Sequence, residues 1–303
     1  MGVRKDEGPG MRGMMGAADY ATEDGNARLA RLARSAVELV APDIAQHFGA
    51  DIGVEAKTSV FDPVTELDRR SERRIAELLQ AEAPGTTLVG EEYGVRSVDA
   101  DRVRWHIDPI DGTMNYVSGF PYFGVSLGVE LDGRLVAGAV CDPMRRETFW
   151  AGSGQAWVND EPLPHVSEDA GTPGVNTMWP YYGEPGDPAA QANLVRLLRS
   201  YGVVRANRSF ALQLAHVAAG RASVAVELDC ADSWDIAGGI ALAQAVGCTV
   251  HALGPNTKRP TPGAGLWASA SYVVARDVED AARVAEAATA VLESREHDTN
   301  EDT

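Results

Sequence analysis

The sequence predicts an α+β protein made of two layered subdomains. Two helical segments open the chain, a series of strand-like segments follows them, and helices alternate with strands in the second half. A connector that contains proline and glycine, Pro162 to Pro173, lies between the halves. A first half rich in consecutive strands, followed by a second half in which helices and strands alternate, is typical of separate layers of sheet and helix. We therefore expect an N-terminal α+β subdomain over residues 23–165 and a C-terminal α/β subdomain over residues 166–295.

The first half begins with two amphipathic helices. From Asn26 to Phe48 the apolar side chains recur at helical spacing, and Pro42 predicts a kink. A second helix is predicted from Thr65 to Ala83. The dipeptide Asp132-Gly133 predicts a β-hairpin. The predicted strands cover residues 87–89, 103–107, 122–130, 134–141 and 147–151.

The second half alternates between helix and strand, and the chain ends are polar or rich in glycine. Helices are predicted over residues 190–200, 209–220, 232–246 and 278–292, and strands over residues 223–228 and 266–274. Residues 1–22 contain Gly and Met without a continuous hydrophobic stretch, which predicts a disordered extension and not a signal peptide. The polar residues 296–303 predict a disordered tail.

Composition and charge exclude several classes of function. Of the 303 residues, 45% are hydrophobic and 23% are charged, as in globular proteins. The formal net charge of −17 argues against binding nucleic acid through its phosphates, which requires clustered Lys and Arg. No apolar run approaches the roughly 18 to 20 residues of a membrane span. The three cysteines lack a CxxC pair, which favours a reducing cytoplasm over a disulfide framework or a zinc site.

Acidic residues stand at the ends of several predicted elements. Asp108 and Asp111 flank a proline directly after an apolar segment, and the simplest interpretation is a surface turn that ends a strand. The other acidic clusters are Glu91 with Glu92, Asp235, and Asp62 with Glu66 and Asp68. These have simpler interpretations too, because acids in the first turn of a helix complement its dipole and Thr65 with Asp68 forms a capping box.

Taken together, the clusters favour metal-assisted phosphate chemistry. Carboxylates brought to one place repel each other unless cations neutralise them. Oxygen ligands without His or Cys at ligand spacing favour a hard cation such as Mg²⁺. Pro109 stiffens the segment, so that Asp108 and Asp111 could share metal ions. Gly112 would allow a phosphate to approach the backbone, and Thr113 adds a hydroxyl.

Three segments, in this order and spacing, resemble the signature segments of the inositol monophosphatase family of Mg²⁺-dependent, Li⁺-sensitive phosphatases. They are GEEYG at residues 90–94, WHIDPIDGTMNY at residues 105–116 and SWDIAGG at residues 233–239. The likeness covers roughly Asn26 to Leu292 and includes residues 120–163 between the motifs. The resemblance implies a layered α-β-α-β-α sandwich and a homodimer.

The resemblance also implies two or three Mg²⁺ ions. Their ligands would be Glu91, Asp108, the backbone carbonyl of Ile110, Asp111 and Asp235. Asp108 would bridge two ions, and Glu91 would also touch a weaker third. Thr113 would orient the attacking water and Asp68 would polarise that threonine, so Thr113, Asp68 and Glu91 are the predicted catalytic residues. Lys57 matches a lysine near the family's site.

The implied substrate contacts are less uniform. By resemblance they come from the amides of Gly112 and Thr113, and from Asp111, Glu227, Arg208 and Asp235. Glu227 lies one residue further from Asp235 than the family's sugar-binding glutamate does. Arg208 and Phe210 stand where the family has small residues, and their simpler interpretation is a surface arginine and a core phenylalanine. We interpret His165, His216 and His251 as structural or surface residues.

The resulting hypothesis is a cytoplasmic phosphomonoesterase for a small phosphorylated alcohol or polyol, with inositol-1-phosphate as the expected substrate and neither nucleic acid nor membrane as a partner. Histidinol phosphate, fructose 1,6-bisphosphate and nucleotide phosphates remain alternatives. The nucleotide branch commonly has Lys-Glu-Phe after Asp-Gly-Thr, whereas this chain has Met114-Asn115-Tyr116. A catalytically silent, metal-binding regulatory protein is the alternative from another class.

Overall fold

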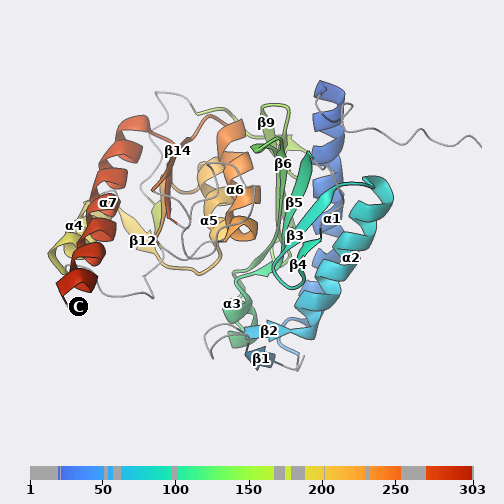
Figure 1. Ribbon diagram of the computed structural model, residues 1–303, viewed down its shortest axis with the longest axis horizontal. Coiled ribbons are helices and arrows are strands. Elements are labelled where there is room, and N and C mark those ends of the chain that lie inside the picture. Colours follow the sequence, from blue (N-terminus) through green and yellow to red (C-terminus); the bar gives the residue numbers. More distant parts are fainter. Residues whose placement is uncertain are drawn as a thin grey trace, which may run out of the picture.

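Helices and sheets alternate in five layers through the molecule (Figure 1). The computed structural model describes residues 20, 22–50, 54–56, 63–96, 102–166, 175–178, 188–200, 202–228, 232–253 and 271–301. From right to left in Figure 1, the helical layers are α1 (Glu23–His47) with α2 (Glu66–Glu82), α5 (Phe210–Ala218) with α6 (Ser233–Ala245), and α4 (Pro188–Ser200) with α7 (Val278–Glu301). A sheet fills each space between them, so the predicted layered α-β-α-β-α sandwich is confirmed.

The larger sheet lies between α1–α2 and α5–α6. Within the described residues its strand order is β10-β9-β8-β7-β6-β5-β3-β4, and all neighbours are antiparallel except β3 and β5. The strands are β3 (Thr87–Gly90), β4 (Gly94–Arg96), β5 (Val103–Asp111), β6 (Gly124–Leu131), β7 (Arg134–Asp142), β8 (Glu147–Gly152), β9 (Gln155–Val158) and β10 (Glu161–Pro162). Asp132-Gly133 turns β6 into β7 as predicted, whereas β4, β9 and β10 were not predicted.

The smaller sheet lies between α5–α6 and α4–α7 and has the order β12-β11-β13-β15-β14 where the chain is described. Its strands are β11 (Val175–Met178), β12 (Val203–Arg205), β13 (Val224–Glu227), β14 (Thr249–Ala252) and β15 (Tyr272–Ala275). The strand predicted over 266–274 thus overlaps β15, and residues 266–270 lie outside the described part. A separate hairpin joins β1 (Val54–Ala56) to β2 (Pro63–Thr65).

Two cores lie on opposite faces of the larger sheet. In β5, Trp105 and Ile107 pack toward α1 and α2, because successive side chains of a strand point to opposite faces. On the other face, Val140 and Phe149 share a cluster with Leu212 of α5 and other residues of the second half. The two predicted subdomains therefore pack on each other through α5 and α6.

The structure describes parts of both chain ends. Tyr20 is buried in the core under α1, and the hydroxyl of Thr22 accepts the N–H of Gly25 at 3.0 Å as the cap of α1. Of the extension predicted over residues 1–22, the described residues are thus one core residue, Tyr20, and the helix cap, Thr22. At the other end α7 continues through Glu301, because no Gly or Pro interrupts it after Val278, so a helix covers most of the predicted tail. Residues 1–19, 21 and 302–303 lie outside the described part.

In the described part of the chain, none of the helices has the length and apolar character required to cross a membrane.

Candidate metal-binding and active site

The two acids of the central motif do not sit in a turn, because β5 continues through both of them. Asp108 pairs with Ser126 of β6 and Asp111 pairs with Gly124, so β5 uses one residue more than β6 over this stretch. Residues three apart in a regular strand face opposite sides, and one extra residue reverses that alternation. This bulge therefore turns both carboxylates to the same face, and the surface-turn interpretation is wrong.

Asp235 joins these two acids from the first turn of α6. One oxygen from each of Asp108, Asp111 and Asp235, the three-acid group, lies within 4.8 Å of the others. Burial raises the pKa of Asp111 to about 7, and burial with nearby acids raises the pKa of Asp108 and Asp235 well above the ordinary value. Three carboxylates this close remain ionised only beside a cation, and oxygen donors suit a hard divalent ion. The donor set therefore fits the predicted metal.

Glu91 borders the three-acid group. It lies in the turn after β3, where its N–H donates to the carbonyl of Ile107 at 3.1 Å and ties the turn to β5. Its side chain is half-buried, and within the described residues it is not one of the three acids that approach within 4.8 Å. After burial, its charge is the next cause of the raised pKa of Asp108. Glu91 is thus close enough to interact electrostatically with a cation held by the three-acid group.

Thr113 and Asp68, the pair that the family resemblance implied, lie close together beside the motif. The hydroxyl oxygen of Thr113 lies 3.4 Å from a carboxylate oxygen of Asp68 and 2.9 Å from the carbonyl oxygen of Ile110. Asp68 is fully buried, and its carboxylate accepts the N–H of Thr65 at 2.9 Å and also the Thr65 hydroxyl. Burial raises the pKa of Asp68 to about 7. This carboxylate therefore caps α2 and at the same time faces the threonine.

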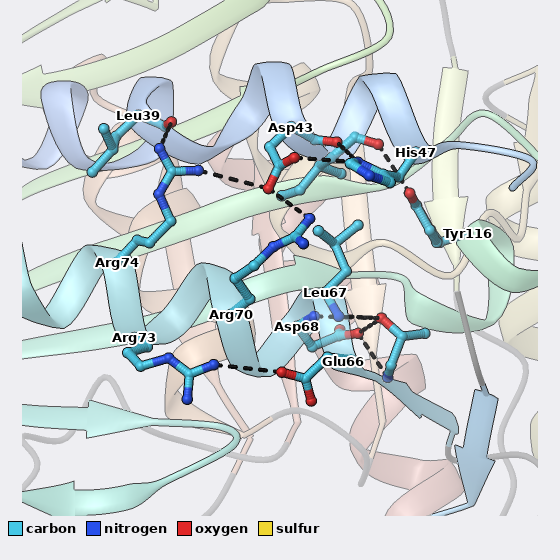
Figure 2. Close-up of polar contacts among 12 residues, drawn as sticks. Leu39, Asp43, His47, Glu66, Leu67, Asp68, Arg70, Arg73, Arg74 and Tyr116 are labelled. Carbon is cyan, nitrogen blue, oxygen red and sulfur yellow. Dashed lines mark hydrogen bonds and ion pairs between the residues drawn. The ribbon is translucent and has the colours of Figure 1, made fainter. Parts of the chain in front are cut away.

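Polar contacts join α2 and α3 (Thr113–Ser118) to α1 near Asp68 (Figure 2). Asp43 of α1 pairs with Arg70 of α2 at 2.8 Å and with Arg74 at 3.6 Å. The hydroxyl of Tyr116, in α3, donates to the carbonyl of Ile44 at 2.9 Å. Glu66 is directed away from this group and pairs with Arg73 near the surface at 3.4 Å. The first turn of α2 thus carries two acids in different surroundings: Asp68 is buried and faces the site, whereas Glu66 is exposed.

Asp111 also caps a helix from the second half of the chain. Its carboxylate accepts the N–H of Phe210 at 3.0 Å, the N–H of Ala211 at 2.9 Å and the hydroxyl of Ser209. A helix leaves such N–H groups without partners at its first turn. The last acid of β5 therefore fixes where α5 begins.

Gly112 is required by both its backbone angle and its surroundings. Its φ is +95°, and a Cβ there would lie 3.0 Å from the carbonyl oxygen of Arg208 and 3.3 Å from that of Tyr122. Asn115 holds the same loops, since its amide nitrogen lies 2.6 Å from the carbonyl oxygens of Tyr122 and Asn207. The structure therefore brings the backbone of Arg208 onto the motif, with the Arg208 side chain half-buried.

The remaining predicted substrate residue lies in the smaller sheet. Glu227 ends β13, is fully buried, and points to the same side as Ala225, toward α5 and α6. One of its oxygens accepts the N–H of Leu228 at 3.2 Å. Phe210 packs partly buried against the core of α5 and α6, as the simpler interpretation predicted.

Other predicted residues lie outside the site or outside the described part. Lys57, Asp62 and Cys230 are not among the described residues. His216 packs edge-on against Tyr122 and Phe149, and burial, with Arg221 nearby, lowers its pKa to about 4. His165 is exposed and His251 is half-buried, which agrees with surface or structural roles.

Glu72 belongs to the site region although no motif contains it. It lies one helical turn after Asp68, is buried, and accepts the N–H of Glu92 at 2.8 Å and of Tyr93 at 3.2 Å. Gly90 gives it room, since a Cβ there would lie 2.0 Å from the carboxylate. Its spacing of four from Asp68 on an amphipathic helix was the available signal.

Comparison with known proteins matches nearly the whole chain. The model of the inositol monophosphatase family matches residues 26–294. Inositol-1-monophosphatase SuhB of Mycobacterium tuberculosis is 37% identical over 228 residues, which are 71% of this chain and 76% of that protein. The Nus factor SuhB of Haemophilus influenzae is 32% identical over 212 residues, 69% of this chain and 78% of that protein. The solved IMPase of Thermotoga maritima superposes with a TM-score of 0.70 at 27% identity, covering 89% of this chain and 98% of the other.

Proposed function

Because the chain belongs to the inositol monophosphatase family, we propose that it is a Mg²⁺-dependent phosphomonoesterase for a small phosphorylated alcohol or polyol. The observation that carries this proposal is the three-acid group lying beside the Thr113–Asp68 pair. A cation site alone would suit many proteins. A cation site next to a hydroxyl that faces a buried carboxylate suits the activation of a water.

The proposed metal ligands are Glu91, Asp108, the Ile110 carbonyl, Asp111 and Asp235, for two or three ions. Bound Mg²⁺ supplies an activated water and charge stabilisation for the leaving oxygen. The half-buried position of Glu91 beside the three-acid group supports its inclusion as a ligand. The Ile110 carbonyl is included because Ile110 lies between Asp108 and Asp111 in β5.

We assign the orientation of the water to Thr113. In this assignment the single proton of the Thr113 hydroxyl goes to Asp68, 3.4 Å away, and not to the Ile110 carbonyl, and the Thr113 oxygen accepts a hydrogen bond from the attacking water. The amides of Gly112 and Thr113 at the start of α3 are the proposed phosphate contacts. In this assignment Asp68 acts on the water only through Thr113.

The proposed substrate is inositol-1-phosphate, which the names of two relatives support. Relatives at 37% and 33% identity are named inositol-1-monophosphatase, from Mycobacterium tuberculosis and Bacillus subtilis. Glu227 and Arg208 would contact the polyol together with Asp111 and Asp235. Histidinol phosphate, fructose 1,6-bisphosphate and nucleotide phosphates remain substrates to be tested beside it.

Arg208 is the proposed selector among these substrates. A guanidinium suits a second anionic or strongly hydrogen-bonding group on the far side of the substrate. Arg208→Ala should lower kcat/KM about ten-fold for the best metabolite, which corresponds to about 1.4 kcal/mol, and should leave an aryl phosphate almost untouched. An equal loss of kcat/KM on both substrates, or no loss on either, would mean that Arg208 is a surface residue without a role in substrate selection.

A regulatory function is the second candidate, since one group of relatives carries the name Nus factor SuhB. The intact Thr113–Asp68 pair argues for turnover, because a silent metal-binding copy has no need of a water-orienting hydroxyl. We also propose a cytoplasmic homodimer that Li⁺ inhibits, on the strength of the family resemblance.

Phosphate release decides between the two candidates. Protein stripped of metal by a chelator should release no phosphate from inositol-1-phosphate and should recover on addition of Mg²⁺. Thr113→Ala should lower kcat while leaving the Mg²⁺ concentration for half-maximal activation nearly unchanged. Full turnover in the chelated protein would refute the metal assignment, and no turnover on any phosphorylated metabolite with Mg²⁺ present would favour the regulatory candidate.

A further inference from the structure

Three buried polar side chains connect the elements that carry Asp108 and Asp235. One ring nitrogen of His106, in β5, lies 3.0 Å from the hydroxyl of Ser233, in α6. The other lies 3.2 Å from a carboxylate oxygen of Glu130, in β6. The exposed fractions of His106, Glu130 and Ser233 are 0%, 2% and 2%. A neutral imidazole has one donor and one acceptor, and these two partners satisfy both.

Each member of this network has a fixed relation to the three-acid group. His106 precedes Asp108 by two residues in β5, so both side chains point to the α6 side, while Trp105 and Ile107 point to the opposite core. Ser233 precedes Asp235 by two residues at the start of α6. The bond between His106 and Ser233 therefore joins the segments of two metal-ligand candidates directly.

The helix α6 packs very close to the larger sheet. A Cβ on Gly128 of β6 would lie 2.2 Å from the Cβ of Ala237, and one on Gly238 would lie 2.9 Å from the hydroxyl of Ser126. The Ser126 hydroxyl donates to the carbonyl of Trp234 at 3.2 Å. Backbone contact thus fixes how deeply α6 packs, and bonds to Ser233 and Trp234 fix its first turn.

We infer that His106, Glu130 and Ser233 form a positioning network that sets the place of Asp235 relative to Asp108, and thereby the affinity of the three-acid group for a divalent cation. The inference rests on the proposed function, since it requires that group to bind metal. Apolar side chains of similar size could fill this space without leaving polar groups to satisfy. The polar network instead specifies one arrangement of the first turn of α6, because each bond has a defined length and direction.

The test compares Ser233→Ala with Thr86→Val. Thr86, just before β3, is a matched buried residue whose hydroxyl accepts a bond from the ring N–H of Trp105 at 3.0 Å, on the face of β5 opposite to His106. Mn²⁺ is titrated calorimetrically into the metal-free full-length proteins, and thermal unfolding is recorded for each. Ser233→Ala should bind Mn²⁺ about 10-fold more weakly, a typical effect of losing an outer-shell partner, with kcat retained at saturating Mg²⁺. Thr86→Val should lose thermal stability and keep the wild-type affinity.

A second variant guards against misfolding of the first. His106→Gln keeps a hydrogen-bonding group in the space and breaks the bond to Ser233, so it should weaken Mn²⁺ binding by a similar factor. Wild-type affinity in Ser233→Ala, or equal weakening in Ser233→Ala and Thr86→Val, would overturn the positioning network while the proposed function stands. A wild-type protein that binds no Mn²⁺ would overturn the proposed metal site itself.

Discussion

At the scale of single residues, Asp111 combines two tasks in one carboxylate. It contributes an oxygen to the three-acid group and accepts bonds from Ser209, Phe210 and Ala211 at the start of α5. An asparagine has the same shape, but its NH₂ group cannot accept a hydrogen bond and it carries no charge. The substitution therefore weakens both tasks at once.

Asp111→Asn should lose more than about 10²-fold in kcat/KM, because it removes charge from a metal ligand and disturbs the start of α5. The control is Glu66→Gln, whose side chain is 66% exposed and pairs only with Arg73 in the contacts described. That variant should stay near wild type in phosphate release. A comparable loss in both variants would mean that general negative charge, and not ligation, supports activity.

Gly112 allows a second test of a single residue. Gly85 has a similar φ of +81° with nothing within 4 Å of a Cβ, whereas a Cβ on Gly112 would press on the carbonyl of Arg208. Gly85→Ala should lower the free energy of unfolding by about 1 kcal/mol, the cost of a left-handed alanine, and keep activity. Gly112→Ala should cost more stability and also lower kcat/KM. Denaturant unfolding and phosphate release measure both, and equal effects would show that the contact with Arg208 is unimportant.

At the scale of elements, the turn after β3 is held by a helix that the motifs do not include. Glu72 of α2 accepts two N–H groups of this turn, from Glu92 and Tyr93, and so places the neighbouring Glu91. Burial raises the pKa of Glu72 to about 7. Two acceptor oxygens are required here, and glutamine offers one.

Glu72→Gln should raise the Mg²⁺ concentration for half-maximal activation about 10-fold and change kcat at saturating Mg²⁺ far less. Glu77→Gln, an exposed position on the same helix, is the control and should match wild type. The measurement is a Mg²⁺ titration of phosphate release at fixed substrate. A fall in kcat with unchanged Mg²⁺ dependence would contradict a role through Glu91.

At the scale of the whole molecule, the buried carboxyls make stability depend on pH and metal together. Burial raises the pKa of Asp68, Glu72 and Asp111 to about 7, and that of Asp108 and Asp235 well above the ordinary value. A raised pKa means that the folded state holds the proton more tightly than the unfolded state. The protonated carboxyls therefore contribute fully to the free energy of unfolding below their ordinary pKa. This contribution is lost as the pH rises through the pKa of the folded state. Burial lowers the pKa of His106 and His216. Below about pH 6.5 these histidines therefore make the folded state more stable as the pH rises, which opposes the effect of the acids.

The melting temperature of metal-free protein should consequently fall between about pH 6.5 and 8, where the histidines no longer compensate. Mg²⁺ should raise the melting temperature more at pH 8 than at pH 6, because ligand carboxyls must lose their protons to bind it. Thermal unfolding in chelator and in Mg²⁺ across this range provides the measurement. Melting temperatures that rise with pH in the chelator would contradict buried, mutually repelling acids.

The local pattern of the sequence was sufficient for the long elements. Apolar spacing predicted α1 and α2 to within a few residues, and the hairpin dipeptide placed the turn between β6 and β7. The acids of the motifs were also identifiable, since their residue types and order limit the chemistry. Short strands such as β4 and β9 were missed because few of their side chains are buried, whereas the equally short β3, β13 and β15 are buried throughout and were predicted.

What only the tertiary structure decided is how these acids face one another. By its own alternation β5 would direct Asp108 and Asp111 to opposite sides, and the bulge that reverses this exists only in register with β6. Asp111 capping α5, Glu72 holding the turn of Glu91, and His106 bonding Ser233 join segments that are far apart in the chain. The sequence by itself determined which residues carry the chemistry and which faces of helices and strands are buried, because side-chain type and periodicity are local properties. Pairing register and contacts between distant segments depend on the packing of the whole chain, and these place the carboxylates within reach of one cation.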